Sequence, residues 1–81
     1  MSKEEVVDIV NEFLIDEFEI EESQLVGDAL MKDDLDIESL DFVDIAVIIE
    51  KEFKIKVTSE EMTQIIKLDD LYNYIMEHSS N

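Results

Sequence analysis

The chain has 81 residues, of which 46% are hydrophobic and 36% are charged. This length suits one small hydrophobic core and is too short for two, so we expect residues 1–81 to form a single domain. The 23 acidic side chains far outnumber the 6 basic ones, which gives a formal net charge of -17. Such a charge repels phosphate backbones and anionic lipids, and it excludes nucleic acid and membrane surfaces as expected partners.

Cysteine is absent, and no apolar run approaches the length of a membrane span. The composition therefore excludes disulfides, zinc–thiolate sites and a cysteine nucleophile. The first residues lack the apolar stretch of a signal peptide, so we expect a cytoplasmic location.

The first predicted element is a helix over residues 3–16. Ser2 followed by Glu5 three positions later is a capping-box pattern, which is typical of a helix start. Apolar residues then recur with the helical period on one face. They are Val6, Val10, Phe13 and Leu14.

Residues 17–38 follow neither the helical nor the strand period and predict a long loop. We expect its apolar side chains to pin it to the core, with one helical turn near residues 29–31. Residues 39–53 contain no glycine or proline and suit a second helix. Residues 54–57 alternate like a strand but have no partner strand, so we interpret them as an extended connector.

The C-terminal part predicts two further helices. Thr58 and Glu61 form a second capping-box pattern, which indicates a short helix. Residues 68–78 repeat the helical apolar period and predict a longer one. The expected fold is therefore all-α: a small four-helix bundle with three longer helices, one short helix and a long loop between the first and second.

The second predicted helix has two apolar faces. Stepping 100° per residue places one stripe toward the core. Its members are Phe42, Ile45, Ala46, Ile49 and Phe53. The opposite side carries Leu40, Val47 and Ile48 among acidic residues, a pattern typical of a transient protein interface. The alternative is that the short helix or the long loop covers Leu40 and Val47.

The sequence around Ser39 resembles a known family. Asp-Ile-Glu-Ser-Leu-Asp at residues 36–41 is similar to the attachment motif of acyl carrier proteins, and the resemblance continues without a gap over residues 35–75. It implies that a separate magnesium-dependent phosphopantetheinyl transferase attaches 4'-phosphopantetheine from coenzyme A to Ser39. The arm's thiol would then carry acyl groups as thioesters. Without the resemblance, Ser39 would be interpreted as an ordinary helix cap.

The resemblance also implies partners and contact residues. Acyl synthases, transferases or ligases with basic docking patches would meet the second helix, and the protein would work as a monomer without membrane insertion. The implied partner-binding residues are Glu38, Leu40, Asp41, Asp44, Val47 and Glu50. The core stripe of Phe42, Ile45, Ala46, Ile49 and Phe53 is the expected lining for an acyl chain.

The chain departs from the family pattern near the motif and at the far end of the helix. Asp36 and Ile37 replace a glycine and a small residue, which removes backbone freedom from the loop. Phe42 stands where a smaller residue is frequent and would constrict an acyl cavity, while Lys51 reverses a common acidic charge. The changes at Lys51 and Phe42 together make a specialised carrier credible.

Other function classes fit less well or stay open. A calcium-binding loop lacks the glycine and the bidentate glutamate that its frame requires, so no metal site is expected. We expect no enzyme, because one histidine and no cysteine or arginine offer few catalytic groups. An acidic helical interaction module, such as a nucleic-acid mimic or inhibitor without a prosthetic group, remains the alternative. The cargo of a carrier is also open: fatty acyl, polyketide or polyene, aminoacyl or sugar-lipid acyl.

Overall fold

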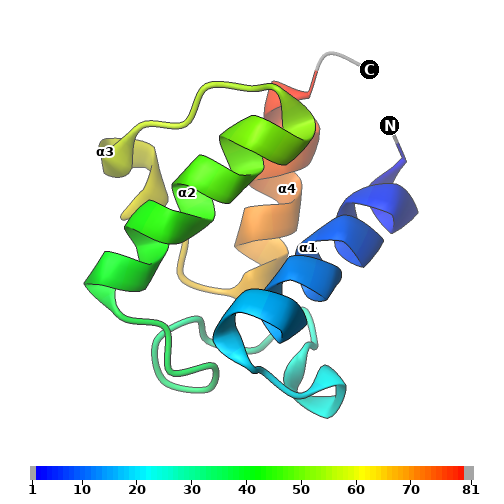
Figure 1. Ribbon diagram of the computed structural model, residues 1–81, viewed down its shortest axis with the longest axis vertical. Coiled ribbons are helices and arrows are strands. Elements are labelled where there is room, and N and C mark those ends of the chain that lie inside the picture. Colours follow the sequence, from blue (N-terminus) through cyan, green and yellow to red (C-terminus); the bar gives the residue numbers. More distant parts are fainter. Residues whose placement is uncertain (1, 80–81) are drawn as a thin grey trace.

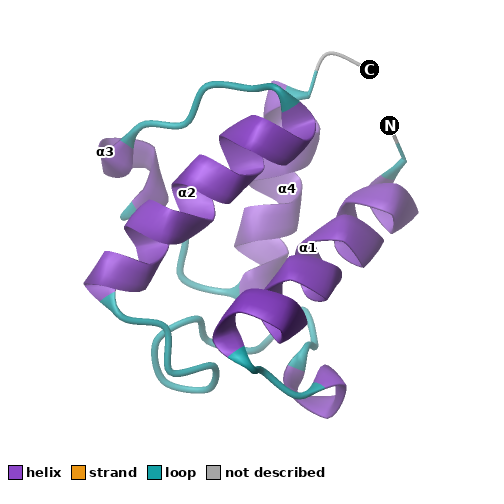
Figure 2. Ribbon diagram, in the orientation of Figure 1, coloured by secondary structure: helices purple, strands orange, loops and turns teal. Residues whose placement is uncertain are grey.

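The computed structural model describes residues 2–79, which form helices joined by loops (Figures 1 and 2). No β-strand occurs within this range. The elements in chain order are α1 (Lys3–Phe18), the 3-10 helix η1 (Glu22–Gln24), α2 (Ser39–Phe53), α3 (Ser59–Met62) and α4 (Leu68–His78). The all-α fold with three longer helices, one short helix and a long loop is confirmed.

Helix α1 begins as predicted but ends two residues later. The Ser2 hydroxyl accepts a hydrogen bond of 3.2 Å from the Glu5 backbone N–H, which completes the predicted cap. The helix continues to Phe18, whose half-buried ring packs against the core, and Glu19 ends it in the left-handed conformation with φ of 55°. The predicted end at residue 16 is therefore wrong, because burial of one more aromatic ring extends the helix.

The long loop is pinned to the core, although its helical turn lies elsewhere than predicted. The helical turn is the 3-10 helix η1 at Glu22–Gln24, whereas Leu30 forms an isolated β-bridge with Lys67 beside the start of α4 and is followed by a turn over residues 31–35. There the backbone N–H of Met31 donates to the Ile66 carbonyl at 2.9 Å, and that of Leu68 donates to the Ala29 carbonyl at 2.9 Å. These bonds use the groups that a helical turn would need for itself.

The last residues of the loop reach α2 through an unusual backbone conformation. Asp36 has φ of 57°, in the left-handed region that favours glycine. Aspartate tolerates this region better than most residues, because its short polar side chain can bond locally. The turn into α2 is therefore made at a position where the resembled family has glycine or a small residue.

The connector after α2 forms no sheet. Residues 54–57 lie outside regular structure, as predicted, and Thr58 precedes the next helix. Lys54 ends α2 in the left-handed conformation with φ of 56°. The short helix α3 follows at once, so the connector places α3 beside α2.

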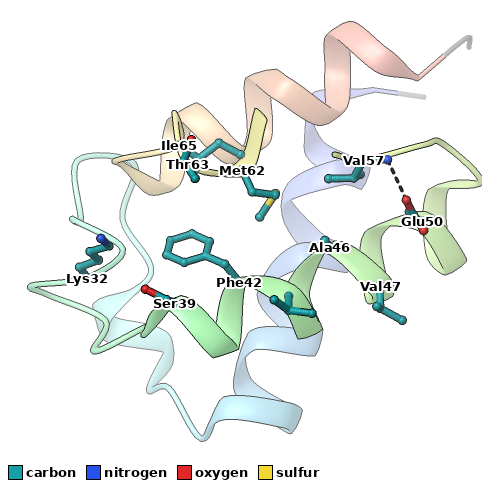
Figure 3. Close-up of a pocket in the computed structure, with 11 residues that line it drawn as sticks. Lys32, Ser39, Phe42, Ala46, Val47, Glu50, Val57, Met62, Thr63 and Ile65 are labelled. Carbon is teal, nitrogen blue, oxygen red and sulfur yellow. Dashed lines mark hydrogen bonds between the residues drawn. The ribbon is translucent and has the colours of Figure 1, made fainter. Parts of the chain in front are cut away.

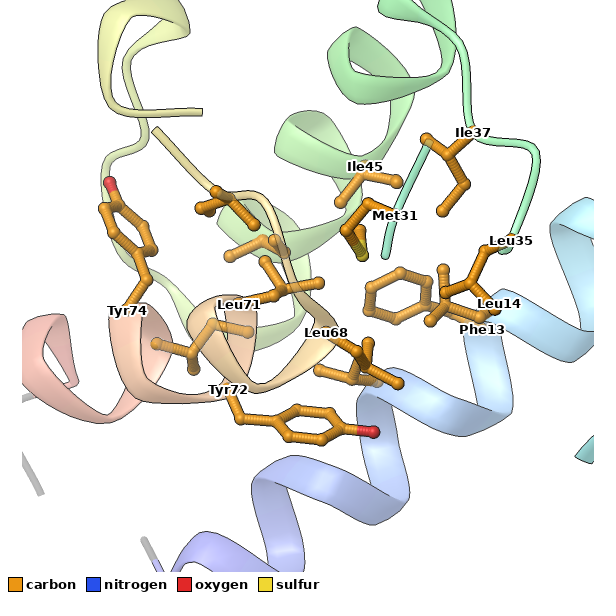
Figure 4. Close-up of a cluster of buried hydrophobic side chains, with 14 of the residues drawn as sticks. Phe13, Leu14, Met31, Leu35, Ile37, Ile45, Leu68, Leu71, Tyr72 and Tyr74 are labelled. Atoms are coloured by element: carbon orange, nitrogen blue, oxygen red, sulfur yellow. The ribbon is translucent and has the colours of Figure 1, made fainter. Parts of the chain in front are cut away.

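The core is built from α1, α2, α4 and the long loop, together with Met62 of α3 and Ile65 just after it (Figure 4). Val6, Val10 and Leu14 of α1 are fully buried, and Leu68, Leu71 and Ile75 of α4 meet them from the other side. The hydroxyl of Tyr72 donates to Asn11 Oδ1 and links α4 to α1 across 61 positions of the chain. Burial against these partners raises the pKa of Tyr72 to about 12.

Helix α2 buries a wider face than its pattern predicted. Ile45, Ile49 and Phe53 are buried, and Phe42 and Ala46 are half-buried. Ile48 was predicted on the outer face, but it is half-buried and packs against the core. The reason is that Ile48 packs against the core at the edge of a surface groove whose other side is formed by Ile9 and Phe13 of α1, so the buried stripe extends toward that flank.

Candidate functional site

Ser39 is the first residue of α2, and its side chain is exposed. The cap residue before it is Glu38, whose backbone N–H donates to Asp41 Oδ2 at 3.0 Å. Within residues 2–79, no side-chain hydrogen bond engages the Ser39 hydroxyl. The carboxylate of Asp41 therefore stabilises the start of the helix, and the serine hydroxyl stays accessible.

A pocket of about 350 Å³ begins beside Ser39 and lies between α2 and α3 (Figure 3). The Phe42 ring and the Met62 side chain extend into the space between the two helices. Most of the lining is apolar. The lining residues are Lys32, Ser39, Phe42, Val43, Ala46, Val47, Glu50, Val57, Met62, Thr63 and Ile65. A volume of this size lies at the small end of the range for ligand pockets in proteins.

The structure divides the five residues predicted to line an acyl chain. Phe42 and Ala46 line the pocket, while Ile45, Ile49 and Phe53 belong to the buried core and do not line it. The opposite wall comes from Val57 in the connector, Met62 in α3, and Thr63 and Ile65 just after it. The place of these residues in the wall could not be predicted from the sequence, because the capping pattern indicates that a short helix forms but not which helix it packs against.

Contacts with the end of α4 hold α3 in place. The Glu61 backbone N–H donates to Thr58 Oγ1 at 3.2 Å, and the Thr58 hydroxyl donates to Glu61 Oε1 at 2.8 Å. His78 Nε2 lies 3.2 Å from Glu61 Oε2, and the His78 ring stacks on Tyr74 with 4.1 Å between centroids. The hydrogen bond from Thr58, helped by the nearby His78, lowers the pKa of the Glu61 carboxyl. The second wall of the pocket is thus tied to the main bundle.

The outer face of α2 is uncovered. Leu40, Val43 and Val47 are 79%, 57% and 59% exposed, and the Asp44 carboxylate lies exposed among them. The alternative that α3 or the long loop covers Leu40 and Val47 is therefore wrong. Exposed apolar side chains rimmed by carboxylates suit a partner with basic residues around an apolar contact.

Glu50 lies at the far end of the pocket and has a partner within the chain. Its Oε2 accepts a hydrogen bond of 2.9 Å from the Val57 backbone N–H (Figure 3). This bond ties the connector to α2 and closes the pocket opposite Ser39. Glu50 is exposed as well, so one carboxylate borders both the pocket and the solvent.

The acidic side chains do not converge on a metal site in the part of the chain that the structure describes. In the long loop, the Asp34 carboxylate accepts a hydrogen bond of 2.8 Å from the Leu30 backbone N–H. No helix among residues 2–79 is long and apolar enough to cross a membrane.

Comparisons with known proteins agree with this geometry. Residues 6–75 match the family model described as the phosphopantetheine attachment site. An acyl carrier protein from Petrotoga mobilis is 32% identical over 95% of this chain and 91% of its own length. One from Rickettsia bellii is 50% identical over 57% of each chain, so that match spans little more than half of the relative. The crystal structure of an acyl carrier protein from Thermotoga maritima superposes with a TM-score of 0.82 at 20% identity, covering 96% of this chain and 91% of the other.

Proposed function

The chain belongs to the acyl carrier protein family, whose cofactor is 4'-phosphopantetheine, and we propose that it bears acyl groups on such an arm attached to Ser39. In this role it passes acyl groups between enzymes of fatty-acid, polyketide or related lipid biosynthesis. It acts as a carrier rather than as an enzyme. We further propose that residues 1–81 form one domain and that the protein works as a monomer in the cytoplasm.

The position of Ser39 is the observation that carries the proposal. Its exposed hydroxyl stands at the start of a helix and at the mouth of an apolar pocket, within the Ser-Leu-Asp motif. When attached, the group supplies a thiol that binds acyl chains as thioesters, which this cysteine-free chain cannot do by itself. The helix N-terminus favours the negative charge of a phosphodiester at this place.

The pocket between α2 and α3 is the proposed shelter for a short or medium acyl chain. Phe42 and Ala46 contact it from α2, and Val57, Met62 and Ile65 contact it from the opposite wall. Ile45, Ile49 and Phe53 lie on the buried side of α2, and their close packing in the core keeps this helix rigid. Exclusion of water by apolar side chains favours entry of the chain by about 0.8 kcal/mol per buried methylene.

The outer face of α2 is the proposed docking surface for phosphopantetheinyl transferase and for acyl synthases, transferases or ligases. Its residues are Glu38, Leu40, Asp41, Asp44, Val47 and Glu50. Carboxylates steer a partner with a basic patch, and the apolar side chains supply contact area after the encounter. A surface of this kind favours weak and fast complexes, which a carrier needs in order to visit several enzymes.

Intact mass spectrometry tests the proposal. The protein is incubated with coenzyme A, magnesium and a broad-specificity phosphopantetheinyl transferase, together with Ser39→Ala and the matched control Ser23→Ala. We expect the unmodified chain and Ser23→Ala to gain the mass of one phosphopantetheinyl group, and Ser39→Ala to gain none. A lack of any gain with several transferases would contradict the proposal and would favour an acidic interaction module.

A further inference from the structure

Lys32 is the one basic side chain among the described residues that line the pocket. It comes from the long loop, and it borders the same end of the pocket as the Ser39 hydroxyl (Figure 3). The remaining lining is apolar apart from Ser39, Thr63 and Glu50. A single positive charge therefore lies at the end of the pocket that also holds the proposed attachment point.

The acidic neighbours of Lys32 do not neutralise it through ion pairs. Within residues 2–79 the close contacts between basic and acidic side chains are Lys3 with Asp69 and His78 with Glu61. Two carboxylates, one in the long loop and one in the first turn of α2, accept from backbone groups instead: Asp34 accepts from the Leu30 N–H at 2.8 Å, and Asp41 accepts from the Glu38 N–H at 3.0 Å. The Lys32 ammonium is thus exposed and available to another anion.

We propose that Lys32 is a positioning residue for the prosthetic arm: its ammonium pairs with the phosphodiester on Ser39 and holds the arm at the mouth of the pocket between α2 and α3. This inference rests on the proposed attachment at Ser39. An ammonium beside a phosphate oxygen makes a charge-assisted hydrogen bond, and lysine suits this as a compact point charge.

The charges around Ser39 favour one position of the phosphodiester over others. Asp36, Glu38 and Asp41 oppose a phosphodiester on Ser39, whereas Lys32 attracts it from the pocket side. The balance draws the arm toward α3. Because the pair is exposed to solvent, it shifts the population of the arm rather than locking it.

A spin label on the arm tests the inference without any acyl transfer. The chain has no cysteine, so the thiol of the attached arm is the sole thiol and takes a nitroxide selectively. Paramagnetic broadening of the backbone amides of Val57, Met62 and Ile65 then reports how often the arm lies at the pocket. The same measurement is made on Lys32→Gln and on the control Lys56→Gln. Lys56 is an exposed lysine of the connector, and its substitution removes the same charge.

We expect Lys32→Gln to lower the ratio of docked to free arm about twofold to fivefold, the range that an exposed ion pair provides. Lys56→Gln should leave the ratio unchanged, and about 0.5 M salt should lower it in the unsubstituted protein but not in Lys32→Gln. Equal broadening in the unsubstituted protein and Lys32→Gln, with both fully modified on Ser39, would overturn this inference alone. Failure of Ser39 to accept the group would overturn the proposed function as well.

Discussion

The backbone N–H of Val57 donates a hydrogen bond of 2.9 Å to Glu50 Oε2, and this bond joins the connector to α2 at the end of the pocket that lies away from Ser39. Glu50 is also one of the proposed docking residues. A substitution at this position therefore alters both the pocket and the docking surface. Experiments on partner binding need a variant that separates the two roles.

Glu50→Ala removes the acceptor for the Val57 N–H and should lower the free energy of unfolding by about 1 kcal/mol. Glu50→Gln keeps an acceptor oxygen and should cost less. Urea unfolding measures both, with Glu52→Ala as a control that removes an exposed acidic residue of the same helix. Equal losses for Glu50→Ala and Glu52→Ala would show that the bond to the connector contributes nothing.

Asp44→Lys should slow association with phosphopantetheinyl transferase about tenfold at low salt, because it reverses a charge in the proposed docking surface. The difference should shrink as salt screens the charges. Stopped-flow association kinetics provide the measurement. Asp8→Lys, which makes the same change on the exposed side of α1, is the control. Unchanged association of Asp44→Lys at low salt would remove this residue from the docking surface.

Ala46→Leu should fill part of the pocket and weaken its hold on an acyl chain. In the unsubstituted protein, we expect an octanoyl group to raise the melting temperature above that of the thiol form by at least about 4 °C, since burying several methylenes exceeds about 1 kcal/mol. In Ala46→Leu, the difference in melting temperature between the octanoyl and thiol forms of that variant should be less than about half of this value. Identical melting temperatures for the octanoyl and thiol forms of the unsubstituted protein would contradict a sheltered chain.

Acid should weaken the anchoring of α3 through Glu61. Its pKa is lowered from an ordinary value of 4.5, chiefly by the hydrogen bond from Thr58. A group with a depressed pKa stabilises the fold above its unfolded pKa, and this contribution is lost as the pH falls below about 4.5 and through the folded value. Urea unfolding between about pH 6 and pH 3 should show a steeper loss for the unsubstituted protein than for Glu61→Gln. Glu60→Gln, on the same short helix, should follow the unsubstituted protein.

Substitutions of Asp36 measure how much free energy of unfolding the left-handed backbone conformation before the motif costs. Asp36→Gly should change the free energy of unfolding by less than about 0.5 kcal/mol, because relief of the left-handed conformation is offset by the entropy of the unfolded glycine. Asp36→Val should destabilise the fold by more than about 1 kcal/mol, since a β-branched residue fits φ of 57° poorly. Asp33→Val removes the same charge at a position with negative φ and should cost less. Equal costs for the two valine variants would show that the backbone of Asp36 is unstrained.

The sequence predicted helix bounds and caps correctly where these depend on residues close together in the chain. The bounds of α2 and α4 match the predicted residues 39–53 and 68–78, because the absence of glycine and proline and the helical apolar period act within a few positions. The caps at Ser2 and Thr58 also formed as predicted. The position of Ser39 at the start of a helix follows from the same local patterns.

Tertiary packing decided the features that join distant segments. The predicted helical turn is not centred on residues 29–31, because the Ala29 carbonyl and the Met31 N–H bond to Leu68 and Ile66, and the turn follows at residues 31–35. Ile48 is half-buried because it packs against the core and faces α1 across a surface groove, and the pocket acquires its second wall because Met62 and Ile65 are buried in the core beside α2. Periodicity determines which side of a helix is apolar, but it carries no information about which other segment will cover that side. The residues for attachment and docking could therefore be proposed from the sequence, whereas the walls of the pocket and the place of Lys32 beside Ser39 depend on contacts between segments far apart in the chain.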